Sequence, residues 1–279
     1  MTTEQTTEQT TEHLIARRHD GVLDLTLNQP DKLNALSDSM IAGLLEELGR
    51  AAHDPDVRCV VVSGAGRGFC SGGDVSRMRD RNEGAAAGKA AEQTVEQRMA
   101  TLRRAEEISL MLHELPKPTI AAINGAAAGA GLSLALACDL RIAADSARLI
   151  TAFARVGFSG DFGGTWLMTR LVGPARAKEF YFLADPIEAS QALALGLVNR
   201  VVPAASLMAE TAALAKRIAS GPAIAYGYMK ANINAALTAD FRTLLDREAV
   251  GQTLTGRTED HREAVKAFLE KRQPTFKGR

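Results

Sequence analysis

The segment PTIAAINGAAAGAGLSLALACDLRIAA, residues 118–144, decides the fold. Its first part, TIAAI, is a short apolar run that predicts a strand buried on both faces. A run of glycine and alanine then leads into an apolar stretch that predicts a helix opening near Ala130, and CDLRIAA predicts another buried strand. A strand, a tight turn, a helix and a second strand in this order are typical of an α/β core.

Similar elements precede this segment. Residues 13–27 alternate apolar and polar positions around Asp20-Gly21, which predicts a β-hairpin. Ser37 is a good cap for an amphipathic helix that extends to about residue 53. The run CVVVSG predicts a buried strand that ends in the glycine loop GAGRGFCSGGD.

The pattern divides the chain into three predicted regions. Residues 1–12 form a polar repeat with no apolar stretch, and we expect a disordered tail there. From Gly173 onward the pattern is almost wholly helical. We therefore predict an α/β core over residues 13–205 and a helical oligomerisation region over residues 206–279.

The composition argues against several classes of protein. The chain has 33 basic and 33 acidic residues, so it has no overall basic field to attract nucleic acid. Its three cysteines lack CxxC spacing and its five histidines lack metal-ligand spacing, which predicts no metal site and a cytoplasmic protein. Residues 119–138 carry no charge, but they are too weakly apolar for a confident membrane span, so we predict no membrane partner.

Familiar nucleotide and hydrolase motifs are missing or poorly matched. The loop GAGRG resembles a dinucleotide-binding turn, but its third glycine comes one position early and no acid follows at the expected distance. The sequence contains neither GxxxxGK[ST] nor GxSxG. A nucleotide hydrolase and a serine hydrolase therefore have no support.

Two glycine-rich turns could present backbone amides to a carbonyl oxygen. In FCSGGDV, Gly72 and Gly73 allow a sharp turn with an unhindered N–H group. The first amides of the helix near Ala130 have no internal partner and carry the positive end of the helix dipole. If both turns face one point, they form an oxyanion hole. Tight packing of small residues is the alternative explanation of each turn.

Five stretches together resemble the crotonase, or enoyl-CoA hydratase/isomerase, superfamily, in the family's order and spacing. They are NQPDKLNAL at 28–36, VVVSGAGRGFCSGGDV at 60–75, the segment at 118–144, GGTWLMTRLVG at 163–173 and AFLEKRQPTFK at 267–277. The resemblance implies the α/β crotonase (ClpP/crotonase-like) fold, with a core of stacked ββα units and a C-terminal helical trimerisation region. It also implies an acyl-CoA substrate, no separate cofactor, and a homotrimer or a homohexamer made of two trimers.

The resemblance also implies site residues by position. The amides of Gly73 and Ala130 would bind the thioester carbonyl. The coenzyme A part would lie along a set of residues before and after the first glycine loop, namely Lys32, Leu33, Ala35, Ser71 and Val75. Phe268 and Lys271 would reach toward the nucleotide bound by a neighbouring subunit. The alternative for Phe268 is that it packs as an apolar core residue of its helix.

The reaction depends on departures from the family pattern. Hydratases of this family use two glutamates, and here the corresponding positions hold Ser133 and Phe153. A phenylalanine cannot take a proton, and a serine without a partner is no base near neutral pH. Hydration by a glutamate pair is therefore not expected.

Asp161 is the candidate that replaces the two glutamates. Some isomerases of the family carry their single working aspartate in this turn, before the helix that opens at Phe162. Desolvation by Phe153, Phe158, Phe162 and Trp166 would raise the pKa of Asp161, whereas the helix N-terminus would lower it. Of these residues, we predict that Phe153, Phe162 and Trp166 line the substrate site. The alternative is that Asp161 only caps that helix.

The function predicted from these residues is that of an enoyl-CoA isomerase, which shifts a double bond or rearranges an unsaturated or ring-containing acyl group through a thioester enolate. Three alternatives remain open. One is a hydratase or lyase whose acid is Glu83, Glu92 or Glu96; another is a dehalogenase-like enzyme with Asp161 as nucleophile; the third is a non-catalytic acyl-CoA-binding protein.

Overall fold

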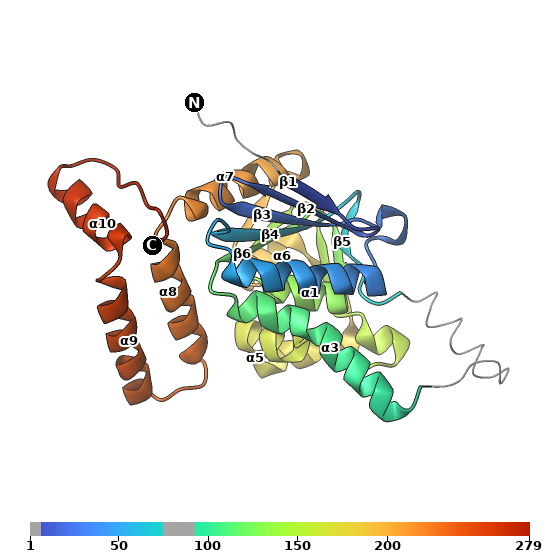
Figure 1. The fold of residues 1–279 in the computed structure, drawn as a ribbon. Coiled ribbons are helices and arrows are strands. Elements are labelled where there is room, and N and C mark those ends of the chain that lie inside the picture. The colour runs from blue at the N-terminus through green and yellow to red at the C-terminus, as the bar shows by residue number, and fades with distance from the viewer. Residues whose placement is uncertain (1–6, 75–92) are drawn as a thin grey trace.

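The computed structural model describes residues 7–74 and 93–279, which form two sheets surrounded by helices (Figure 1). The strand order of the larger sheet is β1-β2-β3-β4-β6-β8-β11, and that of the smaller sheet is β10-β9-β7-β5. The larger sheet contains β1 (Thr7–Thr10), β2 (Leu14–His19), β3 (Val22–Leu27), β4 (Cys59–Gly64), β6 (Thr119–Ile123), β8 (Leu140–Ala144) and β11 (Arg200–Val202). The smaller sheet contains β5 (Gly68–Cys70), β7 (Ala126–Ala128), β9 (Arg148–Ile150) and β10 (Ile187–Glu188).

The centre of the larger sheet is parallel and buried. The strand β6 pairs in parallel with β4 on one side and with β8 on the other. All five residues of β6 are buried, as the apolar run TIAAI predicts. Each of β4 and β6 is followed by a short strand of the smaller sheet, so the glycine-rich turns lie where the chain passes from one sheet to the other.

Local signals in the sequence are confirmed at the N-terminal side. The strands β2 and β3 form the predicted hairpin, and Asp20 and Gly21 both have positive φ, as a tight two-residue turn requires. The helix α1 (Asp38–His53) begins after Ser37, whose side chain accepts a hydrogen bond from the amide of Met40 at 3.2 Å.

The prediction of a disordered tail over residues 1–12 is wrong for part of that range. Thr7–Thr10 form β1, which pairs antiparallel with β2 at the edge of the larger sheet. The guanidinium of Arg17 on β2 also pairs with the carboxylate of Glu8 at 2.8 Å. A polar segment can join a sheet edge because the ladder uses backbone groups, which the composition of the segment does not reveal.

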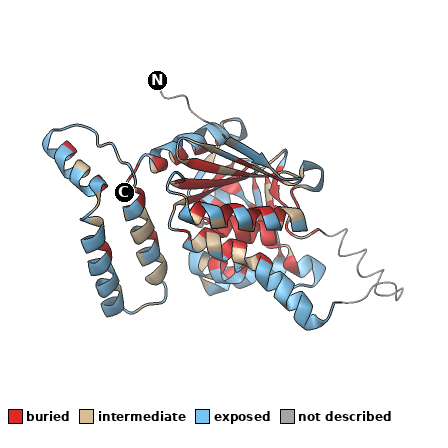
Figure 2. Cartoon of the chain, viewed as in Figure 1, coloured by how far each residue is buried: buried red, intermediate tan, exposed pale blue. Residues whose placement is uncertain are grey.

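Helices cover both sheets. The helix α1 packs against α3 (Val95–Glu114), and α4 (Ala130–Ala137) packs between α3 and α5 (Gly164–Leu183). Buried residues are concentrated in the strands and on the helix faces turned toward them (Figure 2). Every residue of α4 is buried, which fits its lack of polar side chains other than one serine.

The C-terminal part of the chain is less uniformly helical than predicted. Ile187–Glu188 form β10 rather than the start of a helix, followed by α6 (Ala189–Ala194), and β11 completes the larger sheet in parallel with β8. The helix α7 (Leu207–Ala219) packs on β4 and β6, so it belongs with the core although we placed it in the C-terminal region.

Three helices extend away from the two sheets (Figure 1). They are α8 (Ala223–Ala235), α9 (Phe241–Thr255) and α10 (Glu259–Leu269). Large apolar side chains on them are exposed, among them Ile233, Phe241 and Phe268. Among the described helices, none is long and apolar enough to cross a membrane.

Candidate active site

Two glycine-rich turns from different parts of the chain meet at the site. Gly72 has φ +86°, and a Cβ at this position would lie 2.7 Å from the carbonyl oxygen of Ala128 and 3.2 Å from the amide nitrogen of Ala130. A side chain larger than hydrogen therefore does not fit. The loop after β5 and the N-terminus of α4 are held in direct contact.

The loop that ends at Gly73 is supported by Asn34, a residue that sequence reasoning did not single out. The Asn34 side chain is fully buried, and its amide group donates to the carbonyl oxygens of Ala65 at 2.9 Å and Gly68 at 2.8 Å. The backbone amide of Leu36 donates to the carbonyl oxygen of Gly72 at 2.8 Å. The segment around Asn34 thus holds the glycine loop along its length.

The amides of Gly73 and Ala130 are both available to a ligand. Within residues 7–74 and 93–279, neither amide donates a hydrogen bond to a backbone carbonyl group. Ala130 is the first residue of α4, where amides lack intrahelical partners and the helix dipole favours negative charge. This arrangement suits a carbonyl oxygen that gains negative charge. That the two amides bind a thioester stays a prediction.

Asp161 lies in a turn with unusual backbone angles just before α5. Gly160, Phe162 and Gly163 all have positive φ. The Asp161 side chain is half-buried, and its Oδ1 is buried with no hydrogen-bond partner in the described part of the chain. The N-cap of α5 is Gly163, and no side chain caps that helix. Helix capping therefore does not explain Asp161.

Burial raises the pKa of Asp161 to about 6, and the negative charge of Glu106 contributes in the same direction. Of the two opposing effects expected from the sequence, desolvation therefore outweighs the dipole of the following helix. A carboxylate with this pKa is ionised at neutral pH and holds a proton more readily than an exposed aspartate. Such a group is suited to removing and returning a proton.

The side chains around Asp161 connect its turn to α4. A Cβ on Gly164 would lie 2.7 Å from the hydroxyl oxygen of Tyr181, and Ser133 of α4 is in contact with the same glycine. Phe153 stacks on Tyr181, with ring centroids 5.8 Å apart. Burial, with a smaller contribution from the charge of Asp161, raises the pKa of Tyr181. Phe153 and Tyr181 therefore both lie near Gly160, next to Asp161, and the phenol of Tyr181 is a neighbour that the sequence did not indicate.

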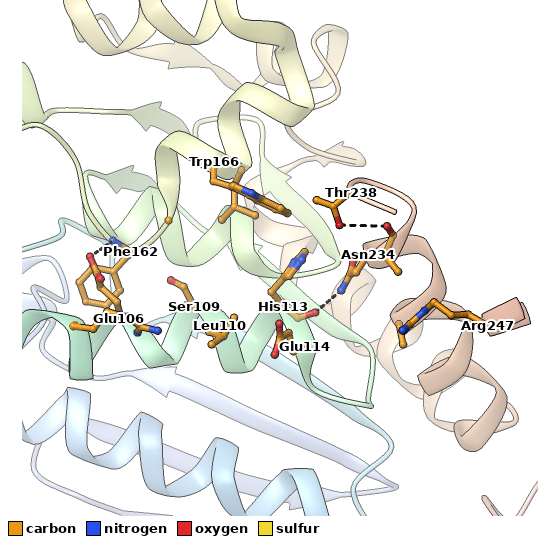
Figure 3. A pocket seen from close by; sticks show the side chains of 15 residues that line it. Glu106, Ser109, Leu110, His113, Glu114, Phe162, Trp166, Asn234, Thr238 and Arg247 are labelled. Atoms are coloured by element: carbon orange, nitrogen blue, oxygen red, sulfur yellow. Dashed lines mark hydrogen bonds between the residues drawn. The ribbon is translucent and has the colours of Figure 1, made fainter. Parts of the chain in front are cut away.

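A cavity of about 630 Å³ runs along α3 from the turn of Asp161 to α8 and α9 (Figure 3). Phe162 and Trp166, both predicted to line the substrate site, form part of its wall. The Trp166 ring packs edge-on against His113 with centroids 5.3 Å apart, and Arg170 lies 3.5 Å above the Trp166 ring centroid. The cavity is large enough for the acyl part of a thioester.

Sequence reasoning missed the residues that α3 contributes to this cavity. Glu106, Ser109 and His113 follow one another at helical spacing and all line it. The spacing of three and four positions was visible in the sequence and could have indicated a polar stripe on one helix face. It could not reveal that this stripe faces the turn of Asp161, because that depends on how α3 packs against α5.

Most of the predicted coenzyme A residues lie together beside Gly73. The Lys32 ammonium pairs with the Asp74 carboxylate at 2.9 Å, and the Ser71 hydroxyl donates to the carbonyl oxygen of Lys32 at 3.1 Å. The carbonyl oxygen of Leu33 accepts the amide of Ser71 at 2.9 Å, whereas the side chain of Ala35 is buried. Val75 lies outside the described residues.

Phe268 and Lys271 lie elsewhere in the chain. Phe268 belongs to α10, which extends away from the sheets, and it is 83% exposed (Figure 1). Lys271 follows the end of the same helix. One chain by itself therefore does not bring these two residues to the loop around Gly73.

The alternative acids and the cysteines lie apart from the turn of Asp161 or outside the described residues. Glu83 and Glu92 lie outside the described residues, and Glu96 is exposed in the first turn of α3. Cys59, Cys70 and Cys138 are buried and unpaired. Across residues 7–74 and 93–279, no three His, Cys, Asp or Glu side chains come together as a metal site requires.

Comparisons with known proteins agree on one family. A family model described as enoyl-CoA hydratase/isomerase matches residues 17–279. The chain is 41% identical to the 1,2-epoxyphenylacetyl-CoA isomerase of Escherichia coli (strain K12), over 96% of this chain and 99% of that protein. It is 35% identical to a short-chain-enoyl-CoA hydratase of Clostridium acetobutylicum, over 94% and 96% of the two chains. A crystal structure of a putative enoyl-CoA hydratase from Streptomyces coelicolor A3(2) superposes with a TM-score of 0.89 at 35% identity and covers all of both chains, which identifies the crotonase fold.

Proposed function

The chain belongs to the enoyl-CoA hydratase/isomerase family, and from this premise we propose that it is an acyl-CoA isomerase with Asp161 as its catalytic acid and base. The observation that carries the proposal is the half-buried Asp161 carboxylate, whose Oδ1 has no hydrogen-bond partner among the described residues. Ser133 and Phe153 occupy the two positions at which the sequence led us to look for glutamates. Asp161 is thus the carboxylate left to move a proton.

The reaction begins when the amides of Gly73 and Ala130 bind the thioester carbonyl oxygen. Asp161 removes a proton from carbon next to the carbonyl or conjugated with it, and the electron pair of the broken C–H bond moves onto that oxygen. The protonated Asp161 then returns the proton to a different carbon, and the electrons move back to form the shifted double bond. No cofactor beyond the coenzyme A of the substrate takes part.

The cavity along α3 supports an acyl group that is cyclic, aromatic or long-chained. Phe162, Trp166 and Leu167 supply apolar surface to it, and Glu106 marks the end near Asp161. The relative from Escherichia coli is named for an acyl group that contains a ring and an epoxide. We therefore place unsaturated, ring-containing thioesters first among the substrates to test.

Hydration is the second candidate, and one observation favours it. Glu106 supplies a second carboxylate next to the turn of Asp161. Two carboxylates could together orient a water molecule and move its protons. Incubation with a 2-enoyl thioester distinguishes the two reactions, because hydration consumes the double bond and adds one water to the product mass, whereas isomerisation leaves the mass unchanged.

We further propose that the protein assembles as a trimer or as a hexamer of two trimers. The side chains of Ile233, Phe241 and Phe268 on the extended helices are 68%, 76% and 83% exposed, which is costly for an isolated chain. In the assembly, Phe268 and Lys271 would contact the nucleotide of a substrate bound by the neighbouring subunit. A cytoplasmic location stays a prediction from the cysteine pattern.

Proton exchange in deuterium oxide tests the proposed function. Wild-type protein and the Asp161→Asn variant are incubated with a panel of acyl-CoA thioesters, and deuterium incorporation is followed by mass spectrometry. We expect the wild type to exchange protons and the variant to lose this exchange. The variant should bind the thioester as tightly as the wild type does. The exposed Asp185 provides the control Asp185→Asn, which should exchange like the wild type. Exchange that persists in Asp161→Asn would contradict the role of Asp161.

A further inference from the structure

Asp161 shares its surroundings with a second carboxylate that comes from a different helix. The Oε1 atom of Glu106 on α3 accepts a hydrogen bond from the backbone amide of Phe162 at 3.2 Å (Figure 3). Phe162 directly follows Asp161, so this bond joins α3 to the turn that carries Asp161. Glu106 is half-buried and lines the cavity proposed for the acyl group.

The turn that Glu106 binds has a backbone that needs external support. Phe162 has φ +50°, in the left-handed region that a phenylalanine rarely adopts. A residue held in such a conformation is strained and persists only where the surrounding structure enforces it. The Phe162 side chain is buried, and its amide is bound by Glu106. Glu106 is therefore one of the contacts that keep this turn in shape.

The titratable groups that act on Asp161 carry no positive charge. Glu106 is the charged side chain that acts on it, and Tyr181 of α5 is a buried neutral neighbour. The helix α4 contributes the hydroxyl of Ser133 at the adjoining Gly164. Within the described residues, no salt bridge joins Asp161 to a cation.

Two arginines on neighbouring elements have other partners. Arg155, in the 3-10 helix Phe153–Val156, donates to the carbonyl oxygen of Ala184 at 2.6 Å. Arg103 of α3 pairs with Glu107 on the same helix at 2.6 Å. The negative charge of Glu106 therefore acts on Asp161 without compensation from these two side chains.

We propose that Glu106 is a positioning residue for Asp161: its carboxylate holds the turn of Asp161 through the Phe162 amide and places a second negative charge beside the group that transfers the proton. This inference rests on the proposed function, in which Asp161 must both take up and return a proton. A carboxylate without such a neighbour would accept a proton less readily in the first step. Glu106 thus contributes both to the orientation of the turn and, in addition to burial, to the proton affinity of Asp161.

Two substitutions separate these contributions. Glu106→Gln removes the charge but keeps an oxygen that can accept the Phe162 amide, whereas Glu106→Ala removes both. The control is Glu179→Gln, because Glu179 is an exposed acid on α5 and is not among the groups that act on Asp161. The protonation of Asp161 is measured directly by infrared titration, as the difference between spectra recorded with Asp161 and with Asp161→Asn. The pH profile of kcat is measured on the same variants.

We expect Glu106→Gln to lower the titration midpoint of Asp161 by about half a pH unit or more, and to move the acid limb of the kcat profile by the same amount. Glu106→Ala should shift the midpoint likewise and also lower kcat by about ten- to a hundredfold, with little change in KM. Glu179→Gln should leave both readouts unchanged.

Each contrary result has a definite meaning. A midpoint that stays in place in Glu106→Gln overturns the electrostatic part of the proposal, and a wild-type kcat in Glu106→Ala overturns the positioning part. A shifted infrared midpoint in a protein whose wild type exchanges no substrate protons supports the coupling between the two carboxylates. The absence of proton exchange in that protein would overturn the proposed function but not the role of Glu106. The failure of one proposal can therefore be told apart from the failure of the other.

Discussion

The backbone of Gly72 lies directly against the amide nitrogen of Ala130, which a Cβ on Gly72 would approach to 3.2 Å. The contact joins the loop after the first glycine run to the N-terminus of α4, and it fixes where the amide of the adjacent Gly73 points. The two proposed oxyanion donors therefore depend on the absence of a side chain at position 72. This dependence leads to the first prediction.

Gly72→Ala should lower kcat by on the order of a hundredfold, the effect of losing one oxyanion donor. The added methyl group would meet the carbonyl oxygen of Ala128 at 2.7 Å, so the two turns must move apart. Steady-state kinetics with an active thioester measure the effect. Gly196→Ala is the control, because Gly196 also has positive φ but has open space around its Cβ position. Equal losses in both variants would mean that backbone strain alone explains the result.

The rate of the wild-type enzyme should fall as the pH drops below about 6. Asp161 must be ionised to remove the first proton, and burial together with the charge of Glu106 raises its pKa to about 6. A profile of kcat/KM against pH reports this value in the free enzyme. An acid limb near the ordinary aspartate pKa of 3.8 would show that the first proton goes to another group or that Asp161 is more exposed during the reaction.

Asp161→Asn should stabilise the folded protein well above pH 6. The native state binds a proton at Asp161 more tightly than the unfolded chain does, since the pKa rises from 3.8 to about 6. The stability that this binding provides is complete below the unfolded value and is lost as the pH rises through the folded value. The variant avoids the buried charge, so we expect a gain of about 1–3 kcal/mol in the free energy of unfolding.

Urea unfolding at several pH values checks this gain. The difference between wild type and Asp161→Asn should shrink as the pH falls toward the ordinary aspartate pKa, because the wild-type carboxyl group then becomes neutral as well. A difference that does not change with pH would point to packing rather than charge as its cause.

Ile233→Asp should reduce the size of the assembly. Ile233 lies on α8 and is 68% exposed in the single chain, so burial against another subunit would stabilise the assembly and a charge there would oppose it. Light scattering coupled to size exclusion measures the mass. Ile233→Leu keeps the apolar surface and should assemble like the wild type. A monomeric wild type would contradict the proposed trimer directly.

Much of the fold follows from short stretches of the sequence. The Asp20-Gly21 turn, the Ser37 cap and the buried strand TIAAI were predicted because each depends on the conformational preferences of adjacent residues. Desolvation of Asp161 was also expected, but the sequence did not decide whether it or the helix dipole would set the direction of the pKa shift. The resemblance to the family was carried by the same local stretches, and the comparisons confirm it.

By itself, the sequence determined the α/β class and the family, and it indicated Asp161 as the candidate catalytic acid. Only the tertiary structure decided that Thr7–Thr10 join a sheet edge, that α7 packs on the core, and that Glu106 binds the Phe162 amide beside Asp161. Local propensities act over a few residues along the chain. Contacts such as that between Glu106 and Phe162 form only after whole helices have packed through their apolar faces, so no short stretch of sequence specifies them.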